Sequence, residues 1–294
     1  MATRVIDDTK LQNIAVAIQG KDSGGTMTVD EMPTRIAAIP TGDEVLFSSK
    51  GRQYTRTVEI PDGVTTLGEY AFNGCTGLTE IDFKNVISIG QSAFSNCTGL
   101  TEIDFKNVIS IGQSAFGSCT SLTEIDLKNV TTFSSNFHFQ YCSSLRKVIG
   151  KKVTSTAHSF YSCTVLNTAI LSNVSTIGQN TFLAAYALKN VDCRNVDRIV
   201  QSAFSGCSRL SLIDLTSRTT PTTLDNTSAF NNTNNTWIAI VANDTIKSDF
   251  QNATNWSTFA SHFRTIAEVE AEVGMTYDEY YLQIFGHARN EVTP

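Results

Sequence analysis

The chain has 294 residues, of which 41% are hydrophobic and 17% charged, and its formal net charge is −6. This composition is typical of a globular protein, and a chain of this length holds one or two domains. The acidic balance excludes the basic footprint of a nucleic-acid-binding protein. No apolar run approaches the roughly 18 residues of a membrane-spanning helix, and the first twelve residues lack an apolar signal-peptide core, so we expect no secretion by the general route.

Residues 1–40 are expected to form a helical hairpin. Leu11, Ile14 and Ile18 share one helical face, Gly20–Gly25 breaks that helix, and Thr28-Val-Asp-Glu31 is a capping box for a second one. The string from Leu11 to Ile36 resembles a segment that is common at the start of phage and prophage tail or baseplate-associated proteins. That resemblance implies a docking or assembly element, whereas the residues alone are also compatible with a hairpin that shields the first repeat. We expect residues 41–63 to form a cap that leads into the repeats.

A 20-residue string occurs twice without change, at 75–94 and at 97–116. The phenylalanine that ends it recurs at Phe72, Phe94, Phe116, Phe139, Phe160, Phe182 and Phe204. Self-similarity at 20 to 29 residues is the signature of a leucine-rich-repeat solenoid. We therefore predict repeats over residues 64–236, with a stretched eighth unit at Phe230.

Each repeat carries apolar residues at fixed distances after its phenylalanine. Leu78, Ile81 and Phe83 show the spacing of a short strand whose alternate side chains enter a core. The apolar residues of Ile89–Phe94 suit one or two helical turns. The fold class predicted is an α/β right-handed leucine-rich-repeat solenoid with a parallel sheet, short helices and helical caps at both ends. Phe94, Phe116, Leu100, Leu122, Ile103 and Ile125 are expected to be buried.

The segment Val58–Leu78 resembles the BspA-like class of leucine-rich repeat, because it follows the pattern I-P-x-x-V-x-x-I-G-x-x-A-F-x-x-C-x-x-L. The resemblance extends over roughly residues 58–240 and implies a bacterial surface or adhesion protein. One departure is that the strands end in Phe-Lys-Asn-Val where the class usually has Ile-Pro, and no proline lies between Asp62 and Thr220.

Seven cysteines recur mostly at one slot of the repeat. A disulfide ladder or a metal site is one interpretation, but parallel Cβ vectors oppose the bridge torsion and no CxxC or CxxH pair exists. The favoured interpretation is free thiols, with Cys97 and Cys119 reduced and buried.

The outward strand positions predict charge ladders in the first three repeats. They are Glu80, Glu102 and Glu124, Asp82, Asp104 and Asp126, and Lys84, Lys106 and Lys128. A calcium site on the acidic rows is the alternative to a solvated face, and we predict no metal and no cofactor. After the third repeat the outward positions become partly apolar. The strip predicted to contact a ligand consists of Lys147, Ile149, Lys151, Thr168, Ile170 and Arg194.

Beyond the repeats, residues 237–266 are expected to form a C-terminal cap, because Asn243–Ala260 resembles the helix and tryptophan that close the solenoids of the BspA-like class. Residues 267–294 contain six acidic residues and one Arg. Thr276–Glu279 is a capping box before Tyr280, Tyr281 and Phe285. This acidic tail helix is predicted to dock on the protein, with partner binding as the alternative.

Enzyme motifs such as GxSxG, a Walker loop, GxGxxG and HExxH are missing. His138 and His158 lie in neighbouring repeats, but no nucleophile accompanies them, so a hydrolase has no further support. We predict a non-enzymatic recognition or adhesion protein that binds a protein or glycan through its solenoid face. The expected location is a phage or prophage tail, hence a virion or a cell surface after lysis; the alternative is a BspA-like cell-surface adhesin.

Overall fold

The computed structural model describes residues 57–60, 63–133 and 136–289. The predicted hairpin at 1–40 and most of the cap at 41–63 lie outside the described residues. The chain divides into unit 1, residues 1–145, and unit 2, residues 146–294. Each unit is described by itself.

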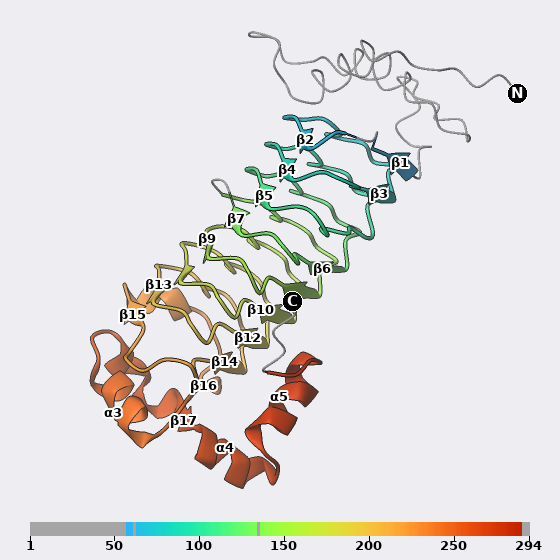
Figure 1. Ribbon diagram of the computed structural model, residues 1–294. Helices are drawn as coiled ribbons and strands as arrows, with labels where there is room; N and C mark the ends of the chain where they lie inside the picture. The colour runs from blue at the N-terminus through green and yellow to red at the C-terminus, as the bar shows by residue number, and fades with distance from the viewer. Residues whose placement is uncertain (1–56, 61–62, 134–135, 290–294) are drawn as a thin grey trace, which may run out of the picture. The chain divides into compact units, whose positions relative to one another are not determined.

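Unit 1 stacks its repeats in parallel register (Figure 1). Its strands are β1 Thr57–Glu59, β2 Thr66–Leu67, β3 Glu80–Asp82, β4 Ser88–Ile89, β5 Ser110–Ile111, β6 Glu124–Asp126 and β7 Thr132–Phe133. Strand β1 pairs with β3, and a second sheet has the order β2-β4-β5-β7. Most repeats of unit 1 thus supply a three-residue strand on the outer side and a two-residue strand to the second sheet.

Unit 2 repeats the same plan with two parallel sheets. Its strands are β8 Lys147–Ile149, β9 Ser155–Thr156, β10 Thr168–Ile170, β11 Thr176–Ile177, β12 Asn190–Asp192, β13 Arg198–Ile199, β14 Leu212–Asp214, β15 Thr223–Leu224, β16 Ile238–Val241 and β17 Phe263–Thr265. The outer sheet runs β8-β10-β12-β14-β16-β17, and the second sheet runs β9-β11-β13-β15. The predicted parallel leucine-rich-repeat solenoid is confirmed, whereas the second sheet was not expected.

Identical side chains stack along the core of each unit. In unit 1 the rings of Phe94 and Phe116 lie 5.2 Å apart and nearly parallel, and in unit 2 Phe182 and Phe204 lie 5.4 Å apart. The predicted eighth repeat is confirmed by Phe230, whose ring stacks on Phe204 at 5.2 Å. Such a ladder buries aromatic area that no single repeat can bury alone.

The repeated cysteines are buried, and Cys97 and Cys119 are free thiols, as predicted. Four of them donate the thiol hydrogen to a carbonyl of the preceding repeat, among them Cys119 to Phe94 O at 3.2 Å and Cys142 to Phe116 O at 3.2 Å. Burial raises the pKa of the Cys142 thiol to about 12, so the proton needed for this bond stays on sulfur. The slot therefore selects a small apolar residue that can also donate one hydrogen bond.

Two local predictions differ from the structure. The segment predicted as one or two helical turns is a run of turns, with Ser92 and Asn96 at positive φ. Ile103, expected to be buried, is only half-buried, and residues 101–105 form no strand. The same sequence forms β3 one repeat earlier, so this difference does not come from local propensity.

The C-terminal cap consists of the 3-10 helices η2 Thr227–Phe230 and η3 Trp256–His262 and the helices α3 Asp244–Asn252, α4 Ile266–Val273 and α5 Tyr277–Phe285. Trp256 is fully buried and donates its indole N–H to Thr222 O at 2.6 Å. The capping box at Thr276 and Glu279 is confirmed, and Gly286 ends α5 in the left-handed conformation. Within the described residues no helix is long and apolar enough to cross a bilayer.

Candidate interaction surface

The outer sheet face of unit 1, called here the open face, displays the predicted charge ladders to solvent. Its exposed carboxylates are Glu80, Asp82, Glu102, Asp104, Glu124 and Asp126, and its lysines are Lys84, Lys106 and Lys128. In β3 and β6 the central isoleucine is buried and its two acidic neighbours are exposed. The period-2 alternation of the strands produces this division between core and surface.

The aspartates of the open face each hold a turn together. Asp82 Oδ1 accepts a hydrogen bond from the backbone N–H of Lys84 at 2.9 Å, and Asp126 does the same for Lys128 at 3.0 Å. Both lysines have positive φ, so the carboxylate stabilises an unfavourable backbone conformation. Lys128 also reaches back to Asp104 at 2.6 Å. The described residues contain no group of three or more His, Cys, Asp or Glu side chains positioned to hold a metal ion.

The outer sheet of unit 2 carries a different row at the same outward position. The strand register aligns Ile149, Ile170, Asp192, Asp214 and Ile240, one residue from each of the strands β8, β10, β12, β14 and β16. We call this row, with its neighbour Leu212, the covered face. Asp192 and Asp214 are the turn-holding aspartates of their repeats, since each accepts from the backbone N–H two residues later.

Helix α5 lies over the covered face. Tyr277, Tyr281 and Phe285 are spaced by four residues and so lie on one side of the helix. They form a cluster with Ile170, Leu212, Ile240 and Val269 of α4. All of these side chains are buried, whereas Leu282 on the opposite side of α5 is 49% exposed. The prediction that the acidic tail docks on the protein is confirmed.

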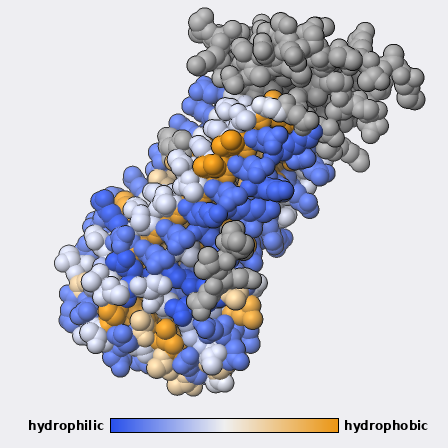
Figure 2. Space-filling model, in the orientation of Figure 1, coloured by the Kyte–Doolittle hydropathy of each residue, from blue (hydrophilic) through white to orange (hydrophobic). Residues whose placement is uncertain are grey.

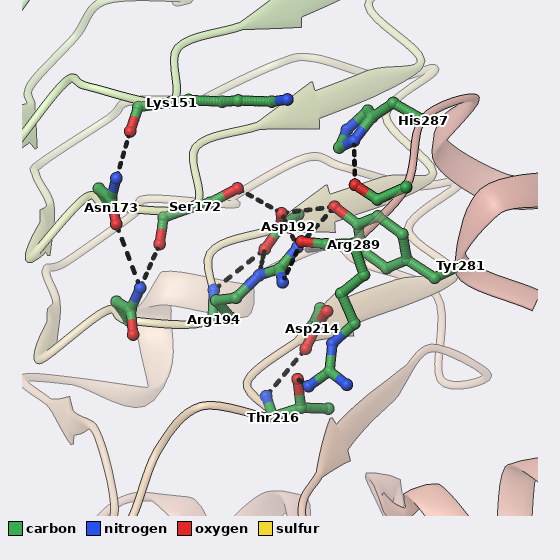
Figure 3. Close-up of polar contacts among 12 residues, drawn as sticks. Lys151, Ser172, Asn173, Asp192, Arg194, Asp214, Thr216, Tyr281, His287 and Arg289 are labelled. Atoms are coloured by element: carbon green, nitrogen blue, oxygen red, sulfur yellow. Dashed lines mark hydrogen bonds and ion pairs between the residues drawn. The ribbon is translucent and has the colours of Figure 1, made fainter. Parts of the chain in front are cut away.

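A polar network lies within this apolar contact (Figure 3). Asp192 forms an ion pair with Arg194 at 2.7 Å and accepts from Ser172 Oγ at 2.6 Å. The Tyr281 hydroxyl donates to Asp192 Oδ2 at 2.6 Å, and the Arg194 guanidinium lies over the Tyr281 ring at 4.9 Å. One tyrosine of α5 thus contacts both members of a buried ion pair.

The ends of α5 are held by basic side chains. Lys147 Nζ donates to Phe285 O at 3.0 Å, in the last turn of the helix, where a cation is favourable. Arg194 donates to Arg289 O at 2.9 Å. Arg289 in turn donates to Thr216 Oγ1 at 2.6 Å, and its guanidinium lies over the Tyr277 ring at 5.1 Å.

Burial acts to raise the pKa of Asp192, Asp214 and Tyr281, and only at Asp192 do the partners reverse the direction of the shift. Burial alone would raise the pKa of Asp192, but the hydrogen bonds and charge of Arg194 hold it below its ordinary value. Asp214 has no such partner, so burial and the Asp192 charge raise its pKa. Burial and the Asp192 carboxylate raise the pKa of Tyr281 far above that of a free phenol.

The six residues predicted to contact a ligand differ in how far they are exposed. Ile170 is fully buried and Thr168 and Arg194 are 8% exposed, while Lys147, Ile149 and Lys151 are half-buried. The expectation that this strip forms an exposed surface is wrong for Ile170, Thr168 and Arg194, because the C-terminal helices cover the outer sheet of unit 2. The tyrosines that cover this strip lie more than 80 residues further along the chain, so the prediction from the repeats alone did not include them.

His138 and His158 each lie next to a side chain of their own unit. His138 is buried and its ring stacks on Phe133 at 4.3 Å. His158 is half-buried, Asn180 lies at 3.4 Å from its Nδ1, and burial lowers its pKa.

Solved structures similar to this chain include leucine rich proteins of bacteria. A leucine rich repeat protein of T. pallidum is 28% identical with a TM-score of 0.48, covering 52% of this chain and 77% of that one. A leucine rich cell surface protein from Faecalibacterium prausnitzii is 19% identical with a TM-score of 0.28, covering 69% and 81%. The pneumococcal vaccine antigen PcpA is 15% identical with a TM-score of 0.32, covering 74% and 80%. No curated protein matches.

The family comparison covers most of the repeats. The BspA type leucine rich repeat region matches residues 47–158 and 151–257, in six copies. These ranges contain the stacked phenylalanines, the thiol donors and the turn-holding aspartates described above. The chain therefore belongs to the BspA type leucine-rich-repeat family.

Proposed function

We propose that this protein is a non-enzymatic recognition protein that binds a protein or glycan through its solenoid surface. The observation that carries the proposal is the open face of unit 1. There, Glu102, Asp104 and Lys106 and their counterparts one repeat away are exposed at the same positions of successive repeats. Solenoids commonly bind through extended faces of this kind.

The chemistry of the open face favours a polar ligand. Carboxylate and ammonium rows lie side by side, and the aspartate turns fix the backbone that carries them. Figure 2 shows hydrophilic residues over the flank of unit 1 where β3 and β6 lie. Mixed rows of donors and acceptors match the hydroxyls of a glycan or the polar rim of a protein.

More specifically, we propose that the protein is part of a phage or prophage tail. This proposal rests on the resemblance of residues 11–36 to the start of tail-associated proteins. A cell-surface adhesin of the BspA-like type is the alternative, and it rests on the repeats. Gene neighbourhood separates them: tail, holin and lysin genes next to this gene favour the first, and an operon of secreted proteins favours the second.

The test is co-sedimentation of the full-length protein with envelope fractions of bacteria that carry the gene. We expect binding by the parent, and at least about tenfold weaker binding by the charge-reversed variant Glu102→Lys/Glu124→Lys, which loses about 1.4 kcal/mol or more. Glu69→Lys/Asp249→Lys is the matched control, since both residues are exposed and lie outside the outer-sheet strands. Failure of the parent to bind any fraction contradicts the recognition role, and equal binding by the Glu102 variant moves the contact away from the open face.

A further inference from the structure

The edge of the unit 2 outer sheet at which the strands begin carries a row of residues fixed by backbone hydrogen bonds. The residues that precede β8, β10, β12 and β14 are Arg146, Asn167, Lys189 and Ser211. From Asn167 onward, each donates its backbone N–H to the carbonyl of the residue before it in the row, at 2.8 Å. The strands β10, β12 and β14 lie side by side (Figure 1). Because neighbouring strands lie about 4.8 Å apart, the backbones of Arg146 and Lys189 are about 10 Å apart.

The basic side chains of this edge are exposed and carry no ion pair. Arg146 and Lys189 belong to the row, and Arg209 lies two residues before its last member. In the part of the chain that the structure describes, no carboxylate lies within ion-pair distance of these three cations. Next to the second sheet, by contrast, Arg198 pairs with Asp225 and Arg218 with Asp197. We call Arg146, Lys189 and Arg209, together with Tyr186, the basic edge.

The turns that lead into the outer strands contain no acid that could offset this charge. Residues 161–168, 183–190 and 205–212 include neither Asp nor Glu. The corresponding stretches of unit 1 end in Glu80, Glu102 and Glu124. The uncharged polar residues between the cations are Thr164, Asn167, Ser208 and Ser211. The basic edge thus combines separated positive charges with hydroxyl and amide groups.

An exposed aromatic ring lies within the basic edge. Tyr186 is 53% exposed, more than any other large hydrophobic side chain of the described residues, and it precedes Lys189 by three positions. Its Cε1 lies 3.7 Å from the place that a Cβ would take at Gly206 in the next repeat. The turn that begins there leads to Arg209. Asn234 holds this turn by donating to the carbonyls on both sides of Arg209, at 3.2 and 2.7 Å.

We propose that the basic edge binds an acidic polysaccharide, whose carboxylates or phosphates pair with the three cations while a sugar ring stacks on Tyr186. Charge complementarity requires an acidic ligand. The flat apolar face of an exposed tyrosine fits the C–H face of a pyranose ring, and the polar residues between the cations fit its hydroxyls. Duplex nucleic acid carries a charge about every 3.4 Å on each strand, which is denser than these cations can match.

This inference goes beyond the recognition role of the open face, because it concerns another unit and other residues. The probe is polygalacturonate, titrated calorimetrically into the full-length protein, with uncharged dextran as the control polymer. We expect polygalacturonate to bind, less tightly at high salt, and dextran not to bind. The variant Arg146→Gln/Lys189→Gln/Arg209→Gln should bind at least about tenfold more weakly.

The matched control is Lys152→Gln/Arg198→Gln/Arg218→Gln, which removes the same charge from unit 2 outside the basic edge. It should bind polygalacturonate like the parent. Protection of the buried Cys207 thiol from labelling checks that each variant is folded. Phosphomannan identifies the acidic group: tighter binding than that of polygalacturonate assigns phosphate, and weaker binding assigns carboxylate.

The role of the ring is tested separately with Tyr186→Ser. This variant should bind polygalacturonate several-fold more weakly and should bind poly(glycerol phosphate), which has charges but no sugar rings, like the parent. If poly(glycerol phosphate) binds as tightly as the polysaccharides and Tyr186→Ser changes nothing, the ligand is not a polysaccharide and the proposal is rejected.

The proposal is overturned if the parent binds neither acidic polysaccharide. Equal losses in the two triple variants would overturn it as well, because net charge and not the basic edge would then decide the affinity. Tighter binding of a single-stranded oligonucleotide or of polyglutamate would replace the polysaccharide by another class of ligand. Every variant keeps Glu102 and Glu124, on which the envelope binding of the open face depends, so the two proposals fail separately.

Discussion

Asp104 and Asp126 in unit 1 occupy the same slot of the repeat as Asp192 and Asp214 in unit 2. Each accepts a hydrogen bond from the backbone N–H two residues later, at 2.8 to 3.3 Å. The first two are exposed, while the second two are fully buried beneath α5. Each of these aspartates closes a local turn. In unit 2 it is also a buried acidic group, because a helix from a distant part of the chain covers it.

The comparison shows what changes when a solenoid face is covered. On the open face the neighbours of the aspartates are charged, and water solvates every carboxylate. On the covered face the corresponding neighbours are Ile149, Ile170 and Ile240, so the aspartates depend on Arg194, Ser172 and Tyr281 for compensation. The repeats supply the same backbone in both units, and only the outward side chains distinguish a polar surface from a helix-binding one.

The largest effect should be the same in both units, because the cores are alike. Phe116→Ala in unit 1 and Phe182→Ala in unit 2 should each lower the free energy of unfolding by about 3–5 kcal/mol, since rigid stacked neighbours cannot fill the cavity. Chemical denaturation measures both. A loss below about 1 kcal/mol at either site would show that the phenylalanine stack does not carry the stability of that unit.

A smaller loss in the free energy of unfolding is expected from a substitution in the contact between α5 and the sheet of unit 2. Tyr281→Phe removes a hydrogen bond to a buried carboxylate and should cost about 1.5–3 kcal/mol. Tyr280→Phe is the matched control, because Tyr280 is on the same helix and only half-buried, and it should change stability little. Equal losses for the two variants, measured by denaturation, would indicate that the Asp192 network does not anchor α5.

High pH should weaken the covered face and leave the open face intact. The pKa of Tyr281 is raised by burial and Asp192, so docking favours the protonated phenol. Its contribution is fully present below about pH 10, where a free tyrosine is protonated, and is lost above it, by up to about 1.4 kcal/mol per pH unit. A titration of tyrosinate absorbance should show late ionisation in the parent. An unchanged titration in Tyr281→Phe would contradict the assignment.

The smallest effect is expected on the open face. Lys128→Ala removes an exposed ion pair with Asp104 and should cost about 0.2–1 kcal/mol, falling further in high salt. Denaturation at low and high salt checks this. A salt-independent loss above about 2 kcal/mol would mean that the charge ladder is structural and not a solvated surface.

The sequence was sufficient to predict the repeats and their solenoid fold, because Phe, Cys and Leu recur at fixed spacings and can be buried together only when the repeats stack. It was insufficient for the turns, because Ser92 and Asn96 have positive φ without being glycine. The second sheet was missed for a related reason: strands of two residues, such as Ser88–Ile89, carry no periodicity of their own.

The covered face was missed because Ile149 and Ile170 were assessed against their own repeats. Their partner arrives from Tyr277, Tyr281 and Phe285, and sequence order does not reveal such a distant contact. The signal was nevertheless present, since the chain contains an apolar outward row and an aromatic row of helical spacing, and neither has another partner in sequence. Two unpaired apolar faces in one chain are best satisfied by each other.

Carboxylate labelling of the native full-length protein with a carbodiimide and an amine, followed by peptide mass spectrometry, compares the two faces in one measurement. It tests directly whether α5 covers one face and leaves the other open. The account predicts rapid labelling of Asp104 and Asp126, protection of Asp192 and Asp214, and loss of that protection in the Tyr277→Ala/Tyr281→Ala/Phe285→Ala variant. Labelling of Asp192 and Asp214 in the parent as fast as that of Asp104 would contradict it.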